Sequence, residues 1–112
     1  MAIWQYVYVT EPTDADLQDA AALLKALAHP LRLAIALELR GEPRCVHELT
    51  ETLHASQPLV SQHLRVLRGA RVVASQRRGR EVTYRLDDDH VGHIVLDAIY
   101  HTTEEGPTHE PH

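Results

Sequence analysis

Two short helical segments separated by a tight break, with a basic hairpin directly after them, constrain the fold of this chain most. The first segment, 45–54, carries apolar residues at helical spacing, and Ala55-Ser56 interrupts it. Ser56 can cap a second helix at 57–69, in which Pro58 is tolerated in the first turn. Two short helices joined by a tight turn, the second with a polar outer side, are typical of a helix-turn-helix.

The segments after this pair predict two strands. Residues 72–76 are β-like, and residues 81–86 alternate apolar and polar side chains. The stretch Arg77-Arg78-Gly79-Arg80 lies between them and is predicted to form a glycine-containing turn. A hairpin in this position is a wing, so the sequence predicts a mainly α-helical winged helix-turn-helix with a small β-hairpin.

Helices are also predicted on both sides of this unit. Residues 13–28 have acidic side chains near the start and are followed by the helix-breaking His29-Pro30, and residues 31–40 are apolar enough to be core. The last helix begins at the acidic cluster 87–89 and is predicted to stop at Gly106-Pro107. The predicted apolar face of the first helix comprises Leu17, Ala20, Leu24 and Leu27.

These boundaries divide the chain into three parts. Residues 1–12 are predicted to form an N-terminal arm with no assigned role, 13–106 a winged helix-turn-helix domain whose C-terminal helix is expected to serve dimerisation and, from the residues described below, metal binding, and 107–112 a histidine-containing tail. A single domain of 112 residues buries a modest core, which a partner chain often completes. A homodimer through the terminal helices is therefore expected.

The charge distribution predicts a nucleic-acid partner although the net charge is −5. Residues 57–86 hold seven arginines and one acid, whereas the flanking segments are acidic. A basic stripe on an acidic protein suits the phosphate backbone of double-stranded DNA, although a merely solvated basic turn is the simpler reading of the hairpin. The predicted DNA-binding residues are Gln57, Ser61, Gln62, Arg65, Arg68, Arg77, Arg78 and Arg80.

The last helix carries residues of the types that bind metal ions. His90 and His101 are eleven positions apart, which places them on nearly the same helix face but about 16 Å apart along the axis. One ion cannot contact both, since zinc ligands lie roughly 2 Å from the metal. An antiparallel second copy would bring His101 and Glu104 of one chain beside Asp88 and His90 of the other, giving two identical four-ligand sites. The simpler alternative is helix capping with exposed polar residues.

Several motifs together resemble the ArsR/SmtB family of winged-helix repressors. They are Leu27-Ala28-His29-Pro30-Leu31-Arg32-Leu33, Cys45-Val46-His47-Glu48-Leu49, Pro58-Leu59-Val60-Ser61-Gln62-His63-Leu64 and Gly79-Arg80 before Tyr84-Arg85-Leu86. Asp88-x-His90 followed by His101-x-x-Glu104 is similar to the interhelical zinc site of the zinc-sensing branch. The resemblance implies a dimeric repressor that binds operator DNA and is released when Zn(II) binds.

The resemblance leaves two further questions about metals. Nickel and cobalt sensors of the family can add tail histidines to the helix site, and His109 and His112 keep Ni(II) or Co(II) as an alternative effector. Cys45 and Glu48 match half of a second family metal site, but the arm has no cysteine or histidine before His29 to complete it. Cys45 is therefore expected to be a buried apolar residue.

Other classes of protein fit the sequence less well. A saturated four-ligand site leaves no open position for a substrate, and no nucleophile motif is present, so an enzyme is not expected. A pure protein-interaction module would not need the wing. No apolar run approaches the roughly 18 residues of a membrane span, and the N-terminus lacks a basic signal region, so a cytoplasmic protein without membrane contact is expected.

Overall fold

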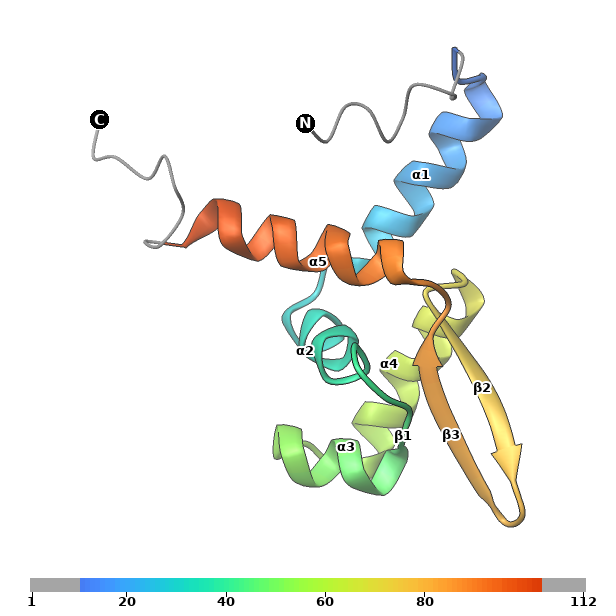
Figure 1. The fold of residues 1–112 in the computed structure, drawn as a ribbon, viewed down its shortest axis with the longest axis vertical. Coiled ribbons are helices and arrows are strands. Elements are labelled where there is room, and N and C mark those ends of the chain that lie inside the picture. The colour runs from blue at the N-terminus through green and yellow to red at the C-terminus, as the bar shows by residue number, and fades with distance from the viewer. Residues whose placement is uncertain (1–10, 104–112) are drawn as a thin grey trace.

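The computed structural model describes residues 11–103, which form a winged helix-turn-helix (Figure 1). The elements are α1 (Asp14–Leu27), α2 (Pro30–Glu38), β1 (Arg44–Cys45), α3 (Val46–Leu53), α4 (Gln57–Gly69), β2 (Val73–Arg78), β3 (Glu81–Leu86) and α5 (Asp89–Thr102). The predicted fold class is confirmed, and the bounds from the first helix to the second strand agree within two residues. The predicted arm 1–12 lies mostly, and the tail 107–112 entirely, outside the described residues.

Side chains that accept backbone N–H groups determine where the helices begin. Thr13 and Asp16 form a reciprocal capping box at the start of α1, and Ser56 accepts from the N–H of Leu59 at the start of α4. His29 caps α2 through Nδ1, which accepts from the N–H of Leu31 at 3.1 Å. Each cap satisfies a donor that the first helical turn leaves without an intrahelical partner.

The core is built around α2, which contacts all four other helices. Its residue Ile35 is fully buried, as are Leu49 of α3, Leu64 of α4 and Val95 of α5. The predicted core role of residues 31–40 is confirmed. Because α2 lies between α5 on one side and α3 with α4 on the other (Figure 1), it connects the last helix to the helix-turn-helix.

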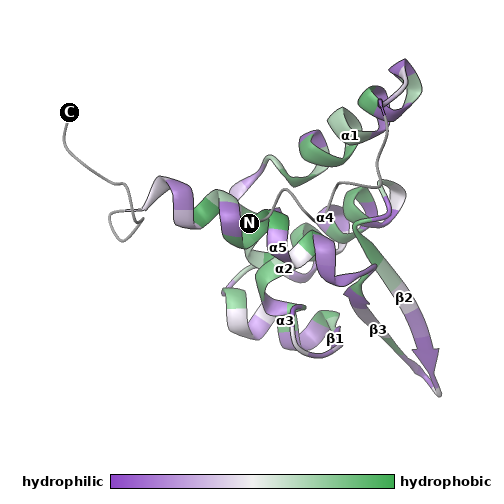
Figure 2. Ribbon diagram, turned by 45° about the horizontal axis from the view of Figure 1, so that its top comes forward, coloured by the Kyte–Doolittle hydropathy of each residue, from purple (hydrophilic) through white to green (hydrophobic). Residues whose placement is uncertain are grey.

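The sheet has three antiparallel strands in the order β1-β3-β2. The two-residue β1 was not predicted; it pairs Arg44 with Tyr84 and Cys45 with Thr83. The predicted turn is also shorter than expected, because β2 continues through Arg78. Gly79, at φ +64°, supplies the left-handed conformation that the tight turn requires. Figure 2 shows that the hydrophilic part of β2 is its outer half.

Helix α1 projects from the body of the domain (Figure 1), and its predicted apolar face is wrong as a core face. Leu27 is buried, but Leu17 and Leu24 are 57% and 54% exposed. The buried residues of α1 are Ala26 and Leu27, so within residues 11–103 the side chains of Leu17 and Leu24 stay largely exposed. Among those residues no single helix is long and apolar enough to cross a membrane, and only α1 and α2, bent by 93°, pass that test together.

Helix α5 ends at Thr102, before the predicted stop at Gly106-Pro107. The hydroxyl of Thr102 donates to the carbonyl of Ile99, and the hydroxyl of Thr103 donates to that of Tyr100. These side chains bond carbonyls that a further helical turn would use, and Thr103 adopts an extended conformation. The predicted stop and Glu104 lie outside the described residues.

Candidate DNA-binding and metal-binding sites

Helix α4 has the two faces that a recognition helix requires. Val60, Leu64 and Leu67 are fully or almost fully buried against the core. Gln57, Gln62, Arg65 and Arg68 are exposed, as predicted, whereas Ser61 is half-buried and less outward than predicted. The helix therefore presents amide and guanidinium donors to solvent from a surface fixed by its buried face, which is what reading base edges in a major groove demands.

The wing arginines are exposed but are not equivalent. Arg77 and Arg78 lie in β2, opposite Val82 and Glu81, and Arg80 lies in the turn. Because successive strand residues point to opposite faces of a sheet, Arg77 and Arg78 cannot both face the same DNA strand from the hairpin. The predicted four-residue turn is therefore shorter than expected, since Arg77 and Arg78 belong to β2.

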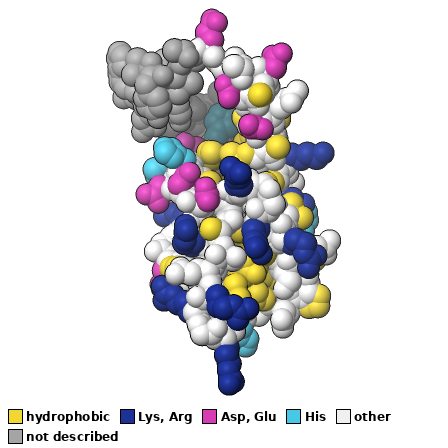
Figure 3. Space-filling model, turned by 90° about the vertical axis from the view of Figure 1, so that its right-hand side faces the viewer, with side chains coloured by type: hydrophobic (Ala, Val, Ile, Leu, Met, Phe, Trp, Pro, Cys, Tyr) yellow, Lys and Arg dark blue, Asp and Glu magenta, His cyan; other side chains and the backbone are white. Residues whose placement is uncertain are grey.

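Basic and acidic side chains lie in different parts of the side of the domain that carries the wing. Figure 3 shows Lys and Arg over the lower part of this side, and Asp and Glu mainly above it. Lys25 lies in the last turn of α1, outside α4 and the wing. This separation gives a positive surface next to α4 on a chain whose net charge is negative.

The first half of the predicted metal site lies at the start of α5. Asp88 is the N-cap, and its Oδ1 accepts from the N–H of His90 at 2.8 Å and of Val91 at 3.3 Å. His90 Nδ1 lies 3.5 Å from the same Oδ1, and the side chains of His90 and Asp88 are 79% and 53% exposed. The structure therefore brings these two predicted ligands together in an accessible position.

The second half lies at the opposite end of the same helix. His101 is exposed in the last turn of α5, and Glu104 falls outside the described residues. Within residues 11–103 no three His, Cys, Asp or Glu side chains are close enough together to hold a metal ion. A single described chain thus presents parts of a site at the two ends of α5 and does not bring them together.

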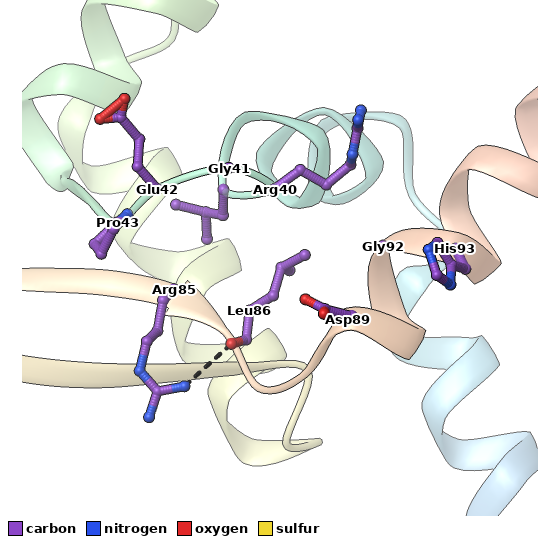
Figure 4. Close-up of a pocket in the computed structure, with 10 residues that line it drawn as sticks. Arg40, Gly41, Glu42, Pro43, Arg85, Leu86, Asp89, Gly92 and His93 are labelled. Atoms are coloured by element: carbon purple, nitrogen blue, oxygen red, sulfur yellow. Dashed lines mark hydrogen bonds between the residues drawn. The ribbon is translucent and has the colours of Figure 1, made fainter.

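A cavity of about 330 Å³ lies beside the start of α5, lined by the end of α2, the following loop and the end of β3 (Figure 4). Gly92 is buried here, and a Cβ at this position would lie 3.1 Å from Cγ of Arg40. The missing side chain lets the stem of Arg40 pack against α5. This contact joins the first half of α5 to the segment that follows α2.

Cys45 is buried, as expected, and is the N-cap of α3. Burial raises the pKa of its thiol, which disfavours the thiolate that a metal needs. Its backbone N–H donates to Glu48 Oε1 at 2.9 Å, and this hydrogen bond lowers the pKa of Glu48. Both residues that match the second metal site of the family have structural roles here.

One polar link was not predicted from the sequence. His63 is 7% exposed on α4, and its Nδ1 accepts from Arg32 Nε at 3.2 Å. His63 therefore packs inside the domain, between α4 and α2. The residues are 31 positions apart, and no local periodicity identifies such a pair.

Comparison with known proteins decides the family. Residues 29–75 match the sequence model described as bacterial regulatory protein, arsR family. Over 95 residues the chain is 57% identical to the HTH-type transcriptional repressor SmtB of Mycobacterium tuberculosis, covering 84% of this chain and 70% of that protein. The chain belongs to the ArsR family. This ArsR-family chain is thus a transcriptional repressor of the SmtB/ArsR type, with a DNA-binding winged helix-turn-helix, and its relatives are regulators.

Solved structures agree with the fold of this ArsR-family repressor. The transcriptional repressor PagR of Bacillus anthracis is 36% identical, with a TM-score of 0.71 over 77% of this chain and 99% of that one. The homodimeric winged helix-turn-helix domain of Mb0332 from Mycobacterium bovis has a TM-score of 0.75 at 24% identity, over 93% and 99% of the two chains. The latter likeness concerns the fold alone.

Proposed function

We propose that this ArsR-family repressor binds a palindromic operator as a homodimer and leaves it when Zn(II) is bound between the C-terminal helices of the two chains. The observation that carries the proposal is the division of ligand types between the two ends of α5. Asp88 and His90 lie together at its start, and His101 is exposed at its end, about 16 Å away along the axis. An antiparallel α5 from a second chain would place His101 and Glu104 next to the partner's Asp88.

The described half-site fits zinc in donor type and spacing. In a tetrahedral site with ligands about 2 Å from the ion, neighbouring ligand atoms lie about 3.3 Å apart. The 3.5 Å between Asp88 Oδ1 and His90 Nδ1 is close to that value. Oδ1 of Asp88 accepts both backbone hydrogen bonds, so its Oδ2 is a second oxygen that can coordinate a metal ion. A carboxylate and imidazole set also suits Co(II) and Ni(II), so donor chemistry alone does not choose among the three.

The exposed stripe of α1 supports the homodimer. Leu17 and Leu24 are two helical turns apart and more than half exposed, on the helix whose last turn packs into the core. Burying them against a second chain removes apolar surface from water. A dimer joined through α1 and α5 sets the distance between the two α4 helices, which must be about 34 Å to enter successive major grooves.

Regulation then depends on how α5 packs against the rest of the domain. Asp88 and His90 of one chain and His101 and Glu104 of the other would hold Zn(II), which would link the two α5 helices when bound. Residues of α5 pack on α2, and α2 packs on α4, so a change in the pairing of the two α5 helices changes how far apart the two α4 helices are held. A coupling of about 3 kcal/mol changes operator affinity by more than a hundredfold.

Substitution of the exposed arginines should weaken DNA binding through the phosphate backbone. Arg65→Ala and Arg78→Ala should each lower the slope of log affinity against log salt by about one, because each removes one phosphate contact. Fluorescence anisotropy at several salt concentrations measures these slopes. Lys25→Ala, with the same charge change on α1, is the matched control and should keep the wild-type slope. Wild-type slopes for both arginine variants would place the DNA surface elsewhere.

Cys45→Ser should leave metal sensing unchanged. Because the thiol is buried with a raised pKa and Glu48 is bonded to its backbone, the variant should still bind one Zn(II) per chain and be released from operator. Placing a hydroxyl in this buried position should lower the free energy of unfolding by about 1 to 2 kcal/mol. Metal analysis and urea unfolding measure the two effects. Loss of half the bound zinc would show that Cys45 is a ligand.

Titration of the purified dimer with Zn(II), Co(II) and Ni(II), read by release of a fluorescent operator, tests the proposal as a whole. The DNA is a palindromic duplex selected in vitro with the metal-free protein. Release at the lowest free concentration by Zn(II) is the expected result. Release by Ni(II) or Co(II) alone would instead favour the alternative effectors, in which the tail histidines His109 and His112 add ligands. No release by any of the three would contradict a metal-responsive repressor.

A further inference from the structure

Arg32 of α2 joins three helices through one guanidinium group. Its Nε donates to Nδ1 of His63 in α4 at 3.2 Å, and its Nη1 donates to the carbonyl of Ala26 in the last turn of α1 at 2.9 Å. Ala26 is buried, and His63 is 7% exposed. A side chain of α2 therefore links the end of the projecting helix α1 to the middle of the recognition helix.

The surroundings of His63 require it to be neutral for this link to form. Nδ1 accepts from Arg32, so the ring proton must be on Nε2. The ring of His29 lies 4.4 Å away, centroid to centroid, while Nδ1 of His29 accepts from the N–H of Leu31. The titratable and charged groups against His63 are thus His29 and Arg32. Burial first, and then these two neighbours, lower the pKa of His63.

We propose that Arg32 is a positioning residue for DNA recognition, which fixes the recognition helix α4 to α1 through His63 and the Ala26 carbonyl. The inference rests on the proposed function, because it assumes operator binding by a dimer in which α1 lies at the interface. His63 directly follows Gln62 on α4, so the bond holds the helix next to its exposed donors. The orientation of α4 relative to α1 decides whether both helices of a dimer fit their grooves together.

This arrangement predicts that acidic pH weakens operator binding. A protonated His63 has no lone pair on Nδ1 to accept from Arg32, and its charge repels the guanidinium. Since its folded pKa is lowered, the unfolded chain takes up the proton first, and the contribution of the link falls as pH decreases below the ordinary histidine value towards the folded pKa. Operator affinity depends on the protonation of His63 in the folded protein, so it should fall as the pH decreases through the lowered folded pKa.

Two pairs of variants test the link. Arg32→Met keeps the aliphatic stem and removes both donors, and His63→Leu removes the acceptor. Each should weaken binding to the selected duplex by about tenfold or more, the equivalent of a lost charge-assisted hydrogen bond. His63→Asn retains an acceptor oxygen close to the position of Nδ1 and should bind within about threefold of wild type. The ammonium group of Arg32→Lys can donate to only one of the two acceptors at a time, so the operator affinity of this variant should be intermediate.

Two further measurements separate positioning from simpler roles. The salt slope of Arg32→Met should equal that of wild type, because Arg32 lies within the domain and contacts no phosphate. Wild-type affinity should fall more steeply than that of His63→Asn as the pH is lowered below the ordinary histidine value of about 6.5, since asparagine does not titrate. The pH comparison uses only wild type and His63→Asn, so it tests whether the Arg32–His63 hydrogen bond contributes to operator affinity even if Arg32→Met fails to fold.

The outcomes distinguish this inference from the proposed function. Equal affinity of Arg32→Met and wild type, a salt slope lower by about one, or identical pH profiles of wild type and His63→Asn would each overturn the positioning role of Arg32. Failure of the wild-type protein to select any duplex would overturn the proposed function itself, and the inference with it. The expected pattern is a tenfold loss for Arg32→Met at unchanged salt slope, with rescue by His63→Asn relative to His63→Leu.

Discussion

His101→Ala should keep the operator affinity of the metal-free dimer within about threefold and lose metal-driven release, a difference of more than a hundredfold in the zinc-loaded state. His101 is exposed in the last turn of α5, and it belongs neither to α4 nor to the wing, the two elements proposed to contact DNA. Removing it leaves each proposed site with three donors, one fewer than the four of a closed tetrahedral zinc site. Operator anisotropy with and without Zn(II) measures both states.

His93→Ala is the matched control for this variant. His93 is an exposed histidine on the same helix, but it lines the cavity beside Arg40 and has no place in the proposed site. The His93→Ala variant should be released from operator DNA at the same Zn(II) concentration as the wild-type protein. If His101→Ala is released at the same zinc concentration as His93→Ala, then His101 is not part of the sensing site.

Leu24→Asp should weaken operator binding by more than a hundredfold by separating the dimer. The side chain is 54% exposed in the single chain and would be buried in the proposed interface, where a carboxylate pays a large desolvation penalty. Two linked half-site contacts exceed a single one by about 10² to 10⁴ in affinity, and a monomer loses that gain. Sedimentation gives the mass of the variant, and anisotropy gives its affinity.

Gln18→Asp introduces the same charge on the same helix, one quarter-turn or so from the Leu17 and Leu24 stripe. This control should remain a dimer with operator affinity close to wild type. Helical circular dichroism of both variants shows whether the domain is folded. A dimeric Leu24→Asp with wild-type affinity would mean that the exposed leucines of α1 are not at the interface.

Most helices and strands of the fold could be predicted from the local periodicity of apolar residues in the sequence. Helix α4 has the predicted bounds because its apolar positions recur at helical spacing between a serine cap and a glycine. The two-residue β1 has no periodicity to detect, and its pairing with Thr83 and Tyr84 is a tertiary contact. Periodicity also identified the apolar stripe of α1. It could not predict whether the stripe is buried in the core or exposed in the single chain, because a core face and an interface give the same pattern.

The candidate sites were predictable where they depend on spacing within one helix. The positions of His90 and His101 on α5 follow from eleven residues of helix, and the Asp88 cap follows from the acidic cluster. Arg32 and His63 are brought together only by the packing of α2 on α4, so their hydrogen bond was not foreseen. The same limit applies to the two faces of the wing, because the length of β2 decides where Arg77 and Arg78 point.

Zinc binding by mixed dimers tests the intersubunit site most directly. Chains carrying His90→Ala and His101→Ala are coexpressed with different tags, and the mixed dimer is purified through both tags. If each site takes Asp88 and His90 from one chain and His101 and Glu104 from the other, the mixed dimer has one site with all four donors and one that lacks two. It should bind one Zn(II) per dimer with wild-type affinity, although neither homodimer binds zinc tightly. A mixed dimer that binds no better than the two homodimers would contradict a site shared between the chains.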